Sequence, residues 1–368
     1  MTKSKNSRLL SIDALRGFDM FFIAGGAAVF LAMQGITGLP WVDALTLQLK
    51  HAPWHGFTFW DLIMPLFLFI TGVSMSFSLK IGLKKGLSKA VLYKKVAIRM
   101  MIMIGLGILI KNTATPIFDP SEIRFVSVLG RIGFASFIGA LLYLNYSARG
   151  QVYWVMGILL SYYAILFLVP VPGYGAGDLS FEGNVVGWID RSLLPGRLLN
   201  GTYDELGLLT QFPALCITVL GCLAGNILQD NKKGKEKTLT LLAVGAGLVA
   251  IGLVWGLHFP INKKLWSSSF IMLTSGLCFM LMAVFYWIID VKGYQKWAFF
   301  FQVIGLNSLT VYFLYNFINF GPVSHKLFGG IYAPLPEEWH SVFQALGAWT
   351  LIWLFLHILY KNRLFVKI

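Results

Sequence analysis

Charged residues are scarce in this sequence. Asp, Glu, Lys and Arg make up 12% of its 368 residues, whereas soluble domains carry about 25%. Hydrophobic residues make up 57%, and the mean hydropathy is +0.71. Several apolar runs reach the roughly 20 residues that a helix needs to cross the hydrocarbon core of a bilayer. The shortage of charge therefore excludes a soluble globular domain and predicts an all-α, polytopic helical membrane protein.

Acidic residues are scarcer than basic ones, and cysteine is rare. The 16 Asp and Glu against 30 Lys and Arg leave a net charge of +14, which by itself would suggest nucleic-acid binding. The basic residues, however, lie in short clusters between apolar runs, as in the cytoplasmic loops of membrane proteins. The three cysteines lie in apolar segments without metal-ligand spacing, and the fingerprints of P-loops, dinucleotide sites, zinc proteases and serine hydrolases are absent. We therefore expect no nucleic-acid partner, no disulfide and no metal site.

The apolar runs predict about ten membrane spans in a single domain that covers residues 1–368. The expected spans are 16–36, 57–79, 96–111, 125–144, 151–170, 207–228, 239–258, 266–289, 298–319 and 341–360, with a long outer loop at 171–206. With the N-terminus in the cytoplasm, the inside segments carry 19 Lys and Arg and the outside segments carry seven. This asymmetry favours cytoplasmic positions for both termini. No cleavage site follows the basic leader, residues 1–8, so we expect the first span to be retained.

A few ionisable residues fall inside the expected spans, where charge is costly and is usually paired or functional. Arg16 follows Asp13 by three residues on one helix face, so it either pairs locally or binds an anionic ligand that arrives from the cytoplasm. Arg131 and Asp61 both lie near the outer ends of their spans. Their depths allow a buried ion pair, and with or without it we expect them to help set the electrostatics around His51.

The stretch LKHAPWHGFTFWDLIMPLFLFITG, residues 49–72, places His51 and His55 just outside an expected span and Asp61 just inside it. A histidine beside tryptophan at a membrane interface is often only an anchor. A carboxylate ten residues later, however, can orient an imidazole for use as a general base. Two other polar sites are candidates: Asn262 with Lys263 at the outer junction of two spans, and Asn307 well inside span 298–319. Such residues either hydrogen-bond between helices or serve as ligand donors.

Seven segments in order carry a family resemblance: SIDALRG, KHAPWHGFTFWDLIMPLFLFITG, VLGRIG, GWIDRSLL, YDELGLL, INKKLWSSSF and GLNSLTVY. With this spacing the chain resembles the transmembrane acyltransferases related to lysosomal heparan-α-glucosaminide N-acetyltransferase, including bacterial relatives called NagX. The resemblance runs from about residue 9 to the C-terminal KNRLFVKI. Two places depart from the lysosomal pattern: residues 23–28 are apolar where that enzyme has Asn-Tyr-Gly-Gly, and Tyr315 stands where it has histidine.

The resemblance implies an acetyl-CoA-dependent N-acetyltransferase in a bacterial inner membrane, acting as a homodimer on a glucosamine-type amino sugar at the outer side. His51 matches the proposed active-site histidine of the family and is expected to act as general base or acetyl acceptor. The other expected site residues are Asp61, Asn262, Lys263 and Asn307 around the reaction, Arg16, Lys94, Lys95, Arg99 and Arg131 around acetyl-CoA, and His55, Asp190, Arg191, Asp204 and Glu205 around the sugar.

Two further functions stay open at this point. An amino-sugar or N-acetylglucosamine transporter would use the same polar residues for binding without chemistry, although the chain has no evident internal repeat of the kind that many transporters have. An O-acyltransferase for an envelope glycan would form an ester instead of an amide.

Overall fold

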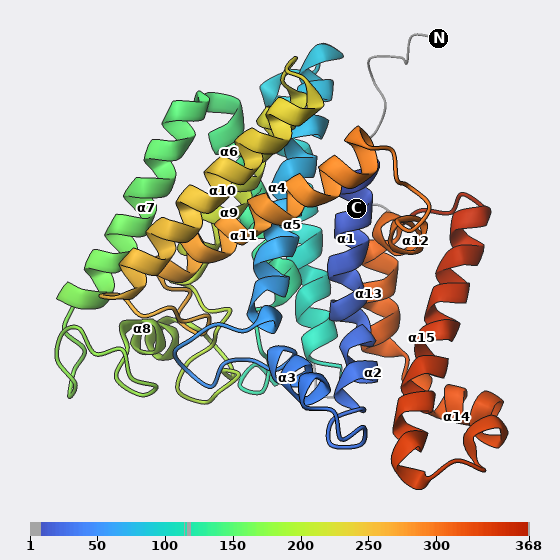
Figure 1. Cartoon of the computed structure of the whole chain (residues 1–368). Coiled ribbons are helices and arrows are strands. Elements are labelled where there is room, and N and C mark those ends of the chain that lie inside the picture. Colours follow the sequence, from blue (N-terminus) through green and yellow to red (C-terminus); the bar gives the residue numbers. More distant parts are fainter. Residues whose placement is uncertain (1–8, 114, 116–118, 367–368) are drawn as a thin grey trace. The chain divides into compact units, whose positions relative to one another are not determined.

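The computed structural model describes residues 9–113, 115 and 119–366. Within these residues all regular structure is helical, apart from two isolated β-bridges (Figure 1). Eight helical segments are long and apolar enough to cross a membrane. The prediction of an all-α polytopic membrane protein is therefore confirmed. The basic leader expected at the cytoplasmic side, residues 1–8, lies outside the described residues.

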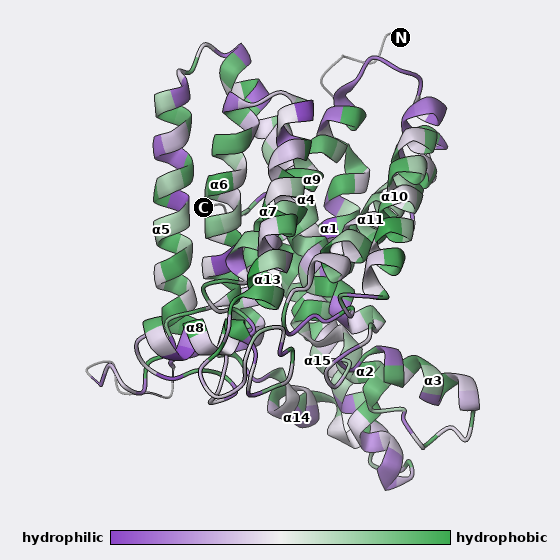
Figure 2. Cartoon of the chain, turned by 90° about the vertical axis from the view of Figure 1, so that its left-hand side faces the viewer, coloured by the Kyte–Doolittle hydropathy of each residue, from purple (hydrophilic) through white to green (hydrophobic). Residues whose placement is uncertain are grey.

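Eight of the expected spans coincide with these long helical segments, and most of their ends agree to within a few residues. They are Leu10–Leu31 (α1, η1 and α2), Phe59–Lys84 (α4), Val128–Asn145 (α6), Ala148–Leu168 (α7), Gln211–Gln229 (α9), Gly234–Gly256 (α10), Ser268–Val291 (α11 and η2) and Glu337–Lys361 (α15). Figure 2 shows hydrophobic residues along these helices, with the more hydrophilic residues toward helix ends and connections.

The two remaining expected spans differ from a simple apolar helix. Residues 96–111 belong to α5 (Lys89–Lys111), which begins earlier and takes in Lys94 and Lys95. Residues 298–319 are divided into α12 (Phe299–Leu306) and α13 (Ser308–Phe317). The interpretation of Asn307 as a residue inside a continuous helix is therefore wrong: its φ of −119° and ψ of 34° end α12. Asn is a weak helix former, which makes it a suitable residue for such a break.

Three short helices lie outside the expected spans. They are α3 (Pro40–Gln48), α8 (Val185–Leu193) and α14 (Phe320–Tyr332). The helix α8 lies within the expected outer loop at 171–206, and Asn184 caps it by accepting a hydrogen bond from Gly187 N. This loop is therefore partly helical, which the Gly- and Asp-rich sequence did not indicate.

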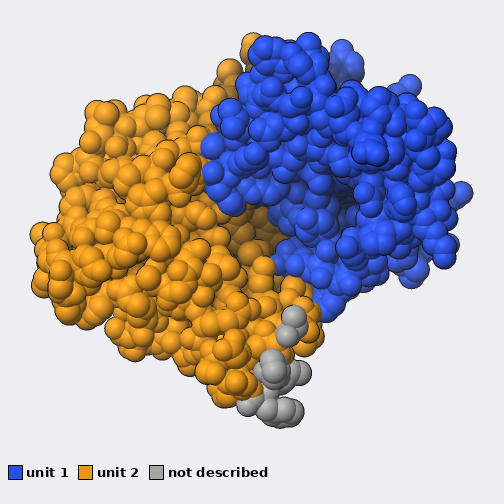
Figure 3. Space-filling model, turned by 90° about the horizontal axis from the view of Figure 1, so that it is seen from below, with its two compact units in different colours: residues 1–51, 58–63, 281–368 blue, residues 52–57, 64–280 orange. Residues whose placement is uncertain are grey.

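The chain forms two compact units, coloured separately in Figure 3. Unit 1 comprises residues up to 51, residues 58–63 and residues from 281 onward, and unit 2 comprises residues 52–57 and 64–280. In unit 1, α1 (Leu10–Phe21) packs closely on α12, because Gly17 meets the Phe301 carbonyl and Gly305 meets the Asp13 carbonyl. Small residues allow helices to approach in this way in membranes.

Unit 2 holds α5 to α10 and most of α4 and α11. Gly72 of α4 meets the carbonyl of Thr218 on α9, and Gly221 of α9 meets that of Phe69 on α4. The rings of Phe69 and Phe279 then pack edge to face at 5.0 Å between α4 and α11. These contacts give unit 2 a core built from facing helices, on which the segments around His55 and the outer loop are supported.

Candidate active site

Asp61 is fixed at the first turn of α4, in the stretch that the sequence singled out. Its carboxylate Oδ2 accepts a hydrogen bond from the Thr58 backbone N–H at 3.0 Å, and Asp61 N donates to the Thr58 carbonyl at 3.0 Å. An acidic side chain that reaches back from the third helical residue to the residue before the helix is one half of a capping box. Asp61 is 1% exposed. The start of α4 therefore holds this carboxylate in one orientation.

His51 lies against the second oxygen of the same carboxylate. Its Nδ1 is 2.7 Å from Asp61 Oδ1, and 34% of its side chain is exposed. The Thr58 hydroxyl lies 2.7 Å from the Lys50 carbonyl and 3.1 Å from Asp61 Oδ2, so it links the segment before His51 to the start of the helix. All of these residues belong to unit 1.

This arrangement has a direct chemical consequence. A carboxylate that accepts from Nδ1–H favours the tautomer in which Nε2 carries the lone pair. The imidazole is then oriented as a base or nucleophile, with its Nε2 on the side of the ring away from Asp61. The structure thus brings together His51 and Asp61, the two residues that the sequence indicated most directly as a site.

Asn262 and Lys263 belong to unit 2, and both have structural partners. Asn262 Oδ1 accepts from Leu265 N at 2.9 Å, and its Nδ2 lies 3.3 Å from His55 Nδ1. Lys263 Nζ lies 3.4 Å from Glu205 Oε2. Partial burial lowers the pKa of His55, which favours its neutral form. These side chains hold the loop after α10 and position His55. The expected role of Asn262 and Lys263 in polarising a carbonyl stays a prediction.

Three of the residues expected to bind the sugar make contacts within and beside the outer loop. Asp204 makes a two-point contact with Arg124 at 2.7 Å for each bond, and both side chains are buried. Asp190 is fully buried and accepts from Asp204 N and Leu208 N. Arg191 donates to the carbonyl of Thr202. Asp190 and Asp204 are therefore buried supports of the loop, and their expected role in binding a sugar stays a prediction.

Asp190 has an unusual ionisation equilibrium for an aspartate. Burial raises its pKa from 3.8 to about 6, although the hydrogen bonds from Asp204 N and Leu208 N act in the opposite direction. Glu205, the last expected sugar ligand, is partly exposed and lies 3.4 Å from both Lys263 and Lys264. Its negative charge is therefore largely matched by these two lysines.

Arg131 is buried in unit 2 in a setting that the sequence did not predict. It donates through Nη2 to the Glu205 carbonyl at 3.0 Å and to the Thr210 hydroxyl, and its guanidinium lies 4.4 Å from the ring centroid of Trp266. Its Nε and Nη1 have no hydrogen-bond partner among the described residues. Trp266 is itself 1% exposed and has a φ of 51°, a conformation that is rare for a bulky residue.

The expected contacts to acetyl-CoA are spread over both units. In unit 1, Arg16 lies 3.5 Å from Asp13, so the local pair expected from the sequence is present. In unit 2, Lys94, Lys95 and Arg99 are exposed on α5. Gly133 packs on Met100 and Met103, which places Arg131 about a dozen Å farther along the helix axis than the two lysines. Arg131 and the two lysines therefore lie at different levels along the helix pair.

Asn307 is fully buried in unit 1, between α12 and α13. Neither its side-chain oxygen nor its nitrogen has a hydrogen-bond partner among the described residues, and the same holds for both carboxylate oxygens of Asp19 on α1. Buried polar groups without partners are uncommon and are expensive to maintain. Both groups therefore keep hydrogen-bonding capacity that the described residues do not use.

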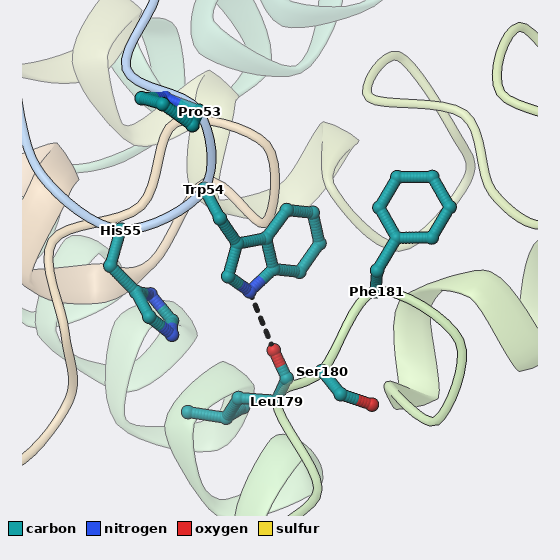
Figure 4. A pocket seen from close by; sticks show the side chains of 6 residues that line it. All are labelled: Pro53, Trp54, His55, Leu179, Ser180 and Phe181. Atoms are coloured by element: carbon teal, nitrogen blue, oxygen red, sulfur yellow. Dashed lines mark hydrogen bonds between the residues drawn. The ribbon is translucent and has the colours of Figure 1, made fainter.

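The sequence did not predict a pocket in unit 2 of about 510 Å³. Pro53, Trp54, His55, Leu179, Ser180 and Phe181 line it (Figure 4). Trp54 Nε1 donates to the Leu179 carbonyl at 3.0 Å, which connects the segment after His51 to the outer loop. Trp54, His51 and His55 could have indicated a site in this segment from the sequence. Phe181, which packs on Trp54, could not, because it lies 127 positions farther along the chain.

Comparisons with known proteins agree with the motif pattern. The family model "Heparan-alpha-glucosaminide N-acetyltransferase, catalytic" matches residues 8–260. The heparan-alpha-glucosaminide N-acetyltransferases of Mus musculus and Homo sapiens are 29% and 30% identical to the chain over alignments of 423 and 416 residues. These alignments cover 100% and 98% of the chain, which spans 61% and 60% of the relatives. The resemblance is confirmed, and the chain belongs to the family of the heparan-alpha-glucosaminide N-acetyltransferase catalytic domain.

Proposed function

We propose that the chain is a membrane acetyltransferase that moves an acetyl group from acetyl-CoA to the amine of a glucosamine-type sugar. The observation that carries this proposal is the contact of 2.7 Å between His51 and the buried, capped Asp61. Family membership supports the reaction class, since the relatives carry the name of an N-acetyltransferase. Amide formation from a sugar ammonium needs a base, and His51 is oriented as one.

The reaction balances with His51 as the base. Its Nε2 removes a proton from the sugar ammonium, and the freed nitrogen lone pair attacks the carbonyl carbon of the thioester. The carbon–sulfur bond then breaks, CoA leaves as a thiolate that takes up a proton, and the amide nitrogen loses its second proton. Alternatively, Nε2 attacks the carbonyl carbon of the thioester and displaces CoA as a thiolate, which takes up a proton from the sugar ammonium. The freed amine then attacks the acetyl group on Nε2, the carbon–nitrogen bond to the imidazole breaks, and the amide nitrogen loses its second proton. In both versions Asp61 is a positioning residue that stabilises the charged imidazolium.

Contacts with acetyl-CoA are proposed in two groups. The exposed Lys94, Lys95 and Arg99 of α5 offer charge for phosphates that arrive from the expected cytoplasmic side. Arg16 of α1, which belongs to the other unit, is a separate candidate for the same role. Arg131 is separate from the two lysines, and its Nε and Nη1 nitrogens have no hydrogen-bond partner among the described residues. We propose that it receives an oxygen of the bound acyl donor, as the buried amide of Asn307 in unit 1 also can. Such donors typically lower a reaction barrier by about 3–4 kcal/mol.

The test is the release of free CoA by purified protein in detergent, measured with and without glucosamine. An acetyltransferase releases CoA in proportion to the N-acetylated sugar formed. Treatment of the product with mild alkali separates the amide from an ester, because only the ester is hydrolysed. Loss of the acetyl group under these conditions would replace N-acetylation by the O-acyltransferase alternative.

A transporter remains the second candidate, and one structural feature favours it. The first span is interrupted at η1 (Phe22–Gly26), where Gly25 has a φ of 89° and lies against the Tyr315 ring. The segment α12–α13 is also interrupted, at Asn307. Interrupted helices often form substrate sites in transporters. Uptake of labelled glucosamine into proteoliposomes without acetyl-CoA would support this candidate, and glucosamine-dependent CoA release would contradict it.

A further inference from the structure

We infer that the aromatic pocket of unit 2 binds the pyranose ring of the amino-sugar acceptor, with Trp54 and Phe181 as its stacking surfaces. This inference rests on the proposed function, because it names the place where the acceptor of that reaction binds. The pocket has a volume of about 510 Å³, within the range of small-molecule sites. It contains both apolar surface and a small number of polar groups, which is the usual composition of such sites.

The aromatic walls are held in place by their neighbours. The rings of Trp54 and Phe181 are 5.5 Å apart, and each packs edge-on against Tyr203, at 5.7 and 5.1 Å. Tyr203 is 1% exposed, whereas Phe181 is 37% exposed. Trp54 is also fixed by its hydrogen bond to the Leu179 carbonyl. A buried tyrosine therefore supports two rings that remain available at the pocket surface.

A pyranose ring suits such walls because one of its faces consists mainly of C–H groups. That face packs on an aromatic ring, while the hydroxyls at the edge of the sugar need hydrogen-bonding partners. Two are present: the Ser180 hydroxyl, which accepts from Gly183 N and can still donate, and His55, whose Nε2 has no protein partner among the described residues. Figure 4 shows His55 and Phe181 on opposite sides of Trp54, with Ser180 beside Phe181.

The charge of the pocket also suits an ammonium group. The partly buried His55 favours its neutral form and does not repel a cation. The face of the Trp54 ring attracts a cation through its quadrupole. The nearby Lys263 and Lys264 both lie 3.4 Å from Glu205, whose single negative charge offsets one of their two positive charges. An amino sugar therefore meets less opposing charge here than the net charge of the chain would suggest.

Chain connectivity limits how far the backbone of Trp54 can lie from that of the proposed base. Trp54 follows His51 by three residues, and three residues span at most about 11 Å.

The test measures glucosamine binding and turnover separately, in the detergent-purified full chain. Phe181→Ala should weaken equilibrium binding of radiolabelled glucosamine and raise its KM by about tenfold, leaving the KM for acetyl-CoA and the thermal unfolding midpoint unchanged. Phe181→Tyr should retain binding, whereas Phe181→Leu should lose it, because only an aromatic ring stacks. The matched control is Tyr174→Ala, since Tyr174 lies in the same loop and is 52% exposed but does not line the pocket.

The outcomes distinguish this inference from the proposed function. If Phe181→Ala and Phe181→Leu bind glucosamine as well as Tyr174→Ala does, the pocket is not the acceptor site, whether or not the protein releases CoA. If the wild type binds glucosamine through Phe181 but releases no CoA, the pocket assignment stands and the acetyl transfer is refuted. Absence of glucosamine binding to the wild type would overturn the inference directly.

Discussion

Asp61→Asn is the substitution whose effect the geometry predicts most closely. The side chain keeps its size, but its two terminal atoms become different. One position, now occupied by Oδ2, faces the backbone N–H of Thr58 at 3.0 Å. That N–H can only donate, so the asparagine oxygen has to take this position. The amide nitrogen must then face His51 Nδ1, which at present lies 2.7 Å from Oδ1.

The reversed hydrogen bond changes the tautomer of His51. An N–H of the asparagine donates to Nδ1, so the imidazole proton moves to Nε2, and the nitrogen that acts as the base is lost. The opposite amide orientation would place two donors against each other at Thr58, at a cost of about 1–3 kcal/mol. That cost alone lowers the population of the tautomer in which Nε2 carries the lone pair by about five- to 150-fold. With the loss of the negative charge opposite the imidazolium, we expect kcat to fall by about 10²- to 10⁴-fold.

The assay is the initial rate of CoA release at saturating acetyl-CoA and glucosamine. Asp43→Asn is the matched control, because Asp43 also belongs to unit 1 and accepts a backbone hydrogen bond, from Gly35 N at 2.9 Å. The thermal unfolding midpoint of both variants shows that they are folded. A kcat of Asp61→Asn within about threefold of the wild type would refute the assigned role of the carboxylate.

Three further predictions concern stability, measured as thermal unfolding of the purified protein. Gly17→Ala should destabilise unit 1 by about 1–3 kcal/mol, because a Cβ there overlaps the carbonyl on α12, whereas Gly330→Ala has open space and should be neutral. Asp204→Asn should cost about 3–5 kcal/mol, because it breaks a buried pair with Arg124. Because the pKa of Asp190 is about 6 instead of 3.8, its contribution to stability is present below pH 3.8 and is lost above pH 6. Relative to Asp190→Asn, the wild type should therefore lose up to about 3 kcal/mol between these values.

Each stability prediction has a result that would contradict it. Equal midpoints for Gly17→Ala and Gly330→Ala would mean that the close approach of α1 and α12 has no energetic weight. An unfolding midpoint of Asp204→Asn equal to that of the wild type would mean that the pair of Asp204 with Arg124 does not stabilise the fold. If the difference in unfolding midpoint between Asp190→Asn and the wild type does not change with pH, the pKa of the Asp190 carboxyl is not raised by folding.

Much of the fold could be predicted because membrane spans depend on local composition. An apolar run of sufficient length is visible in the sequence itself, and the eight long helical segments follow such runs. The pairing of His51 with Asp61 was also accessible, since the two lie ten positions apart on either side of a helix start. The sequence TFWD at that start matches the local pattern of a capping box.

The rest depends on contacts between distant positions, which one sequence does not reveal. Arg124 and Asp204 are 80 positions apart, and Trp54 and the Leu179 carbonyl are 125 apart. For this reason the acidic residues of the outer loop were interpreted as sugar ligands, although Asp204 is bound to an arginine. The break at Asn307 was missed for another reason: the apolar run continues past it without Pro, and Gly305, two residues earlier, lies within α12 where it approaches α1.

The most direct test of the proposed reaction compares His51→Ala with His340→Ala in the same preparation. His340 is a second histidine in unit 1, and its Nε2 contacts the Leu335 carbonyl at 3.0 Å. The measurement is glucosamine-dependent release of CoA together with the amount of N-acetylglucosamine formed. For the wild type and His340→Ala we predict that CoA and N-acetylglucosamine form in equal amounts and at the same rate in both proteins. For folded His51→Ala we predict a rate that is about 10²- to 10⁴-fold lower. A wild-type rate in His51→Ala, or no CoA release from the folded wild type, would contradict the proposal.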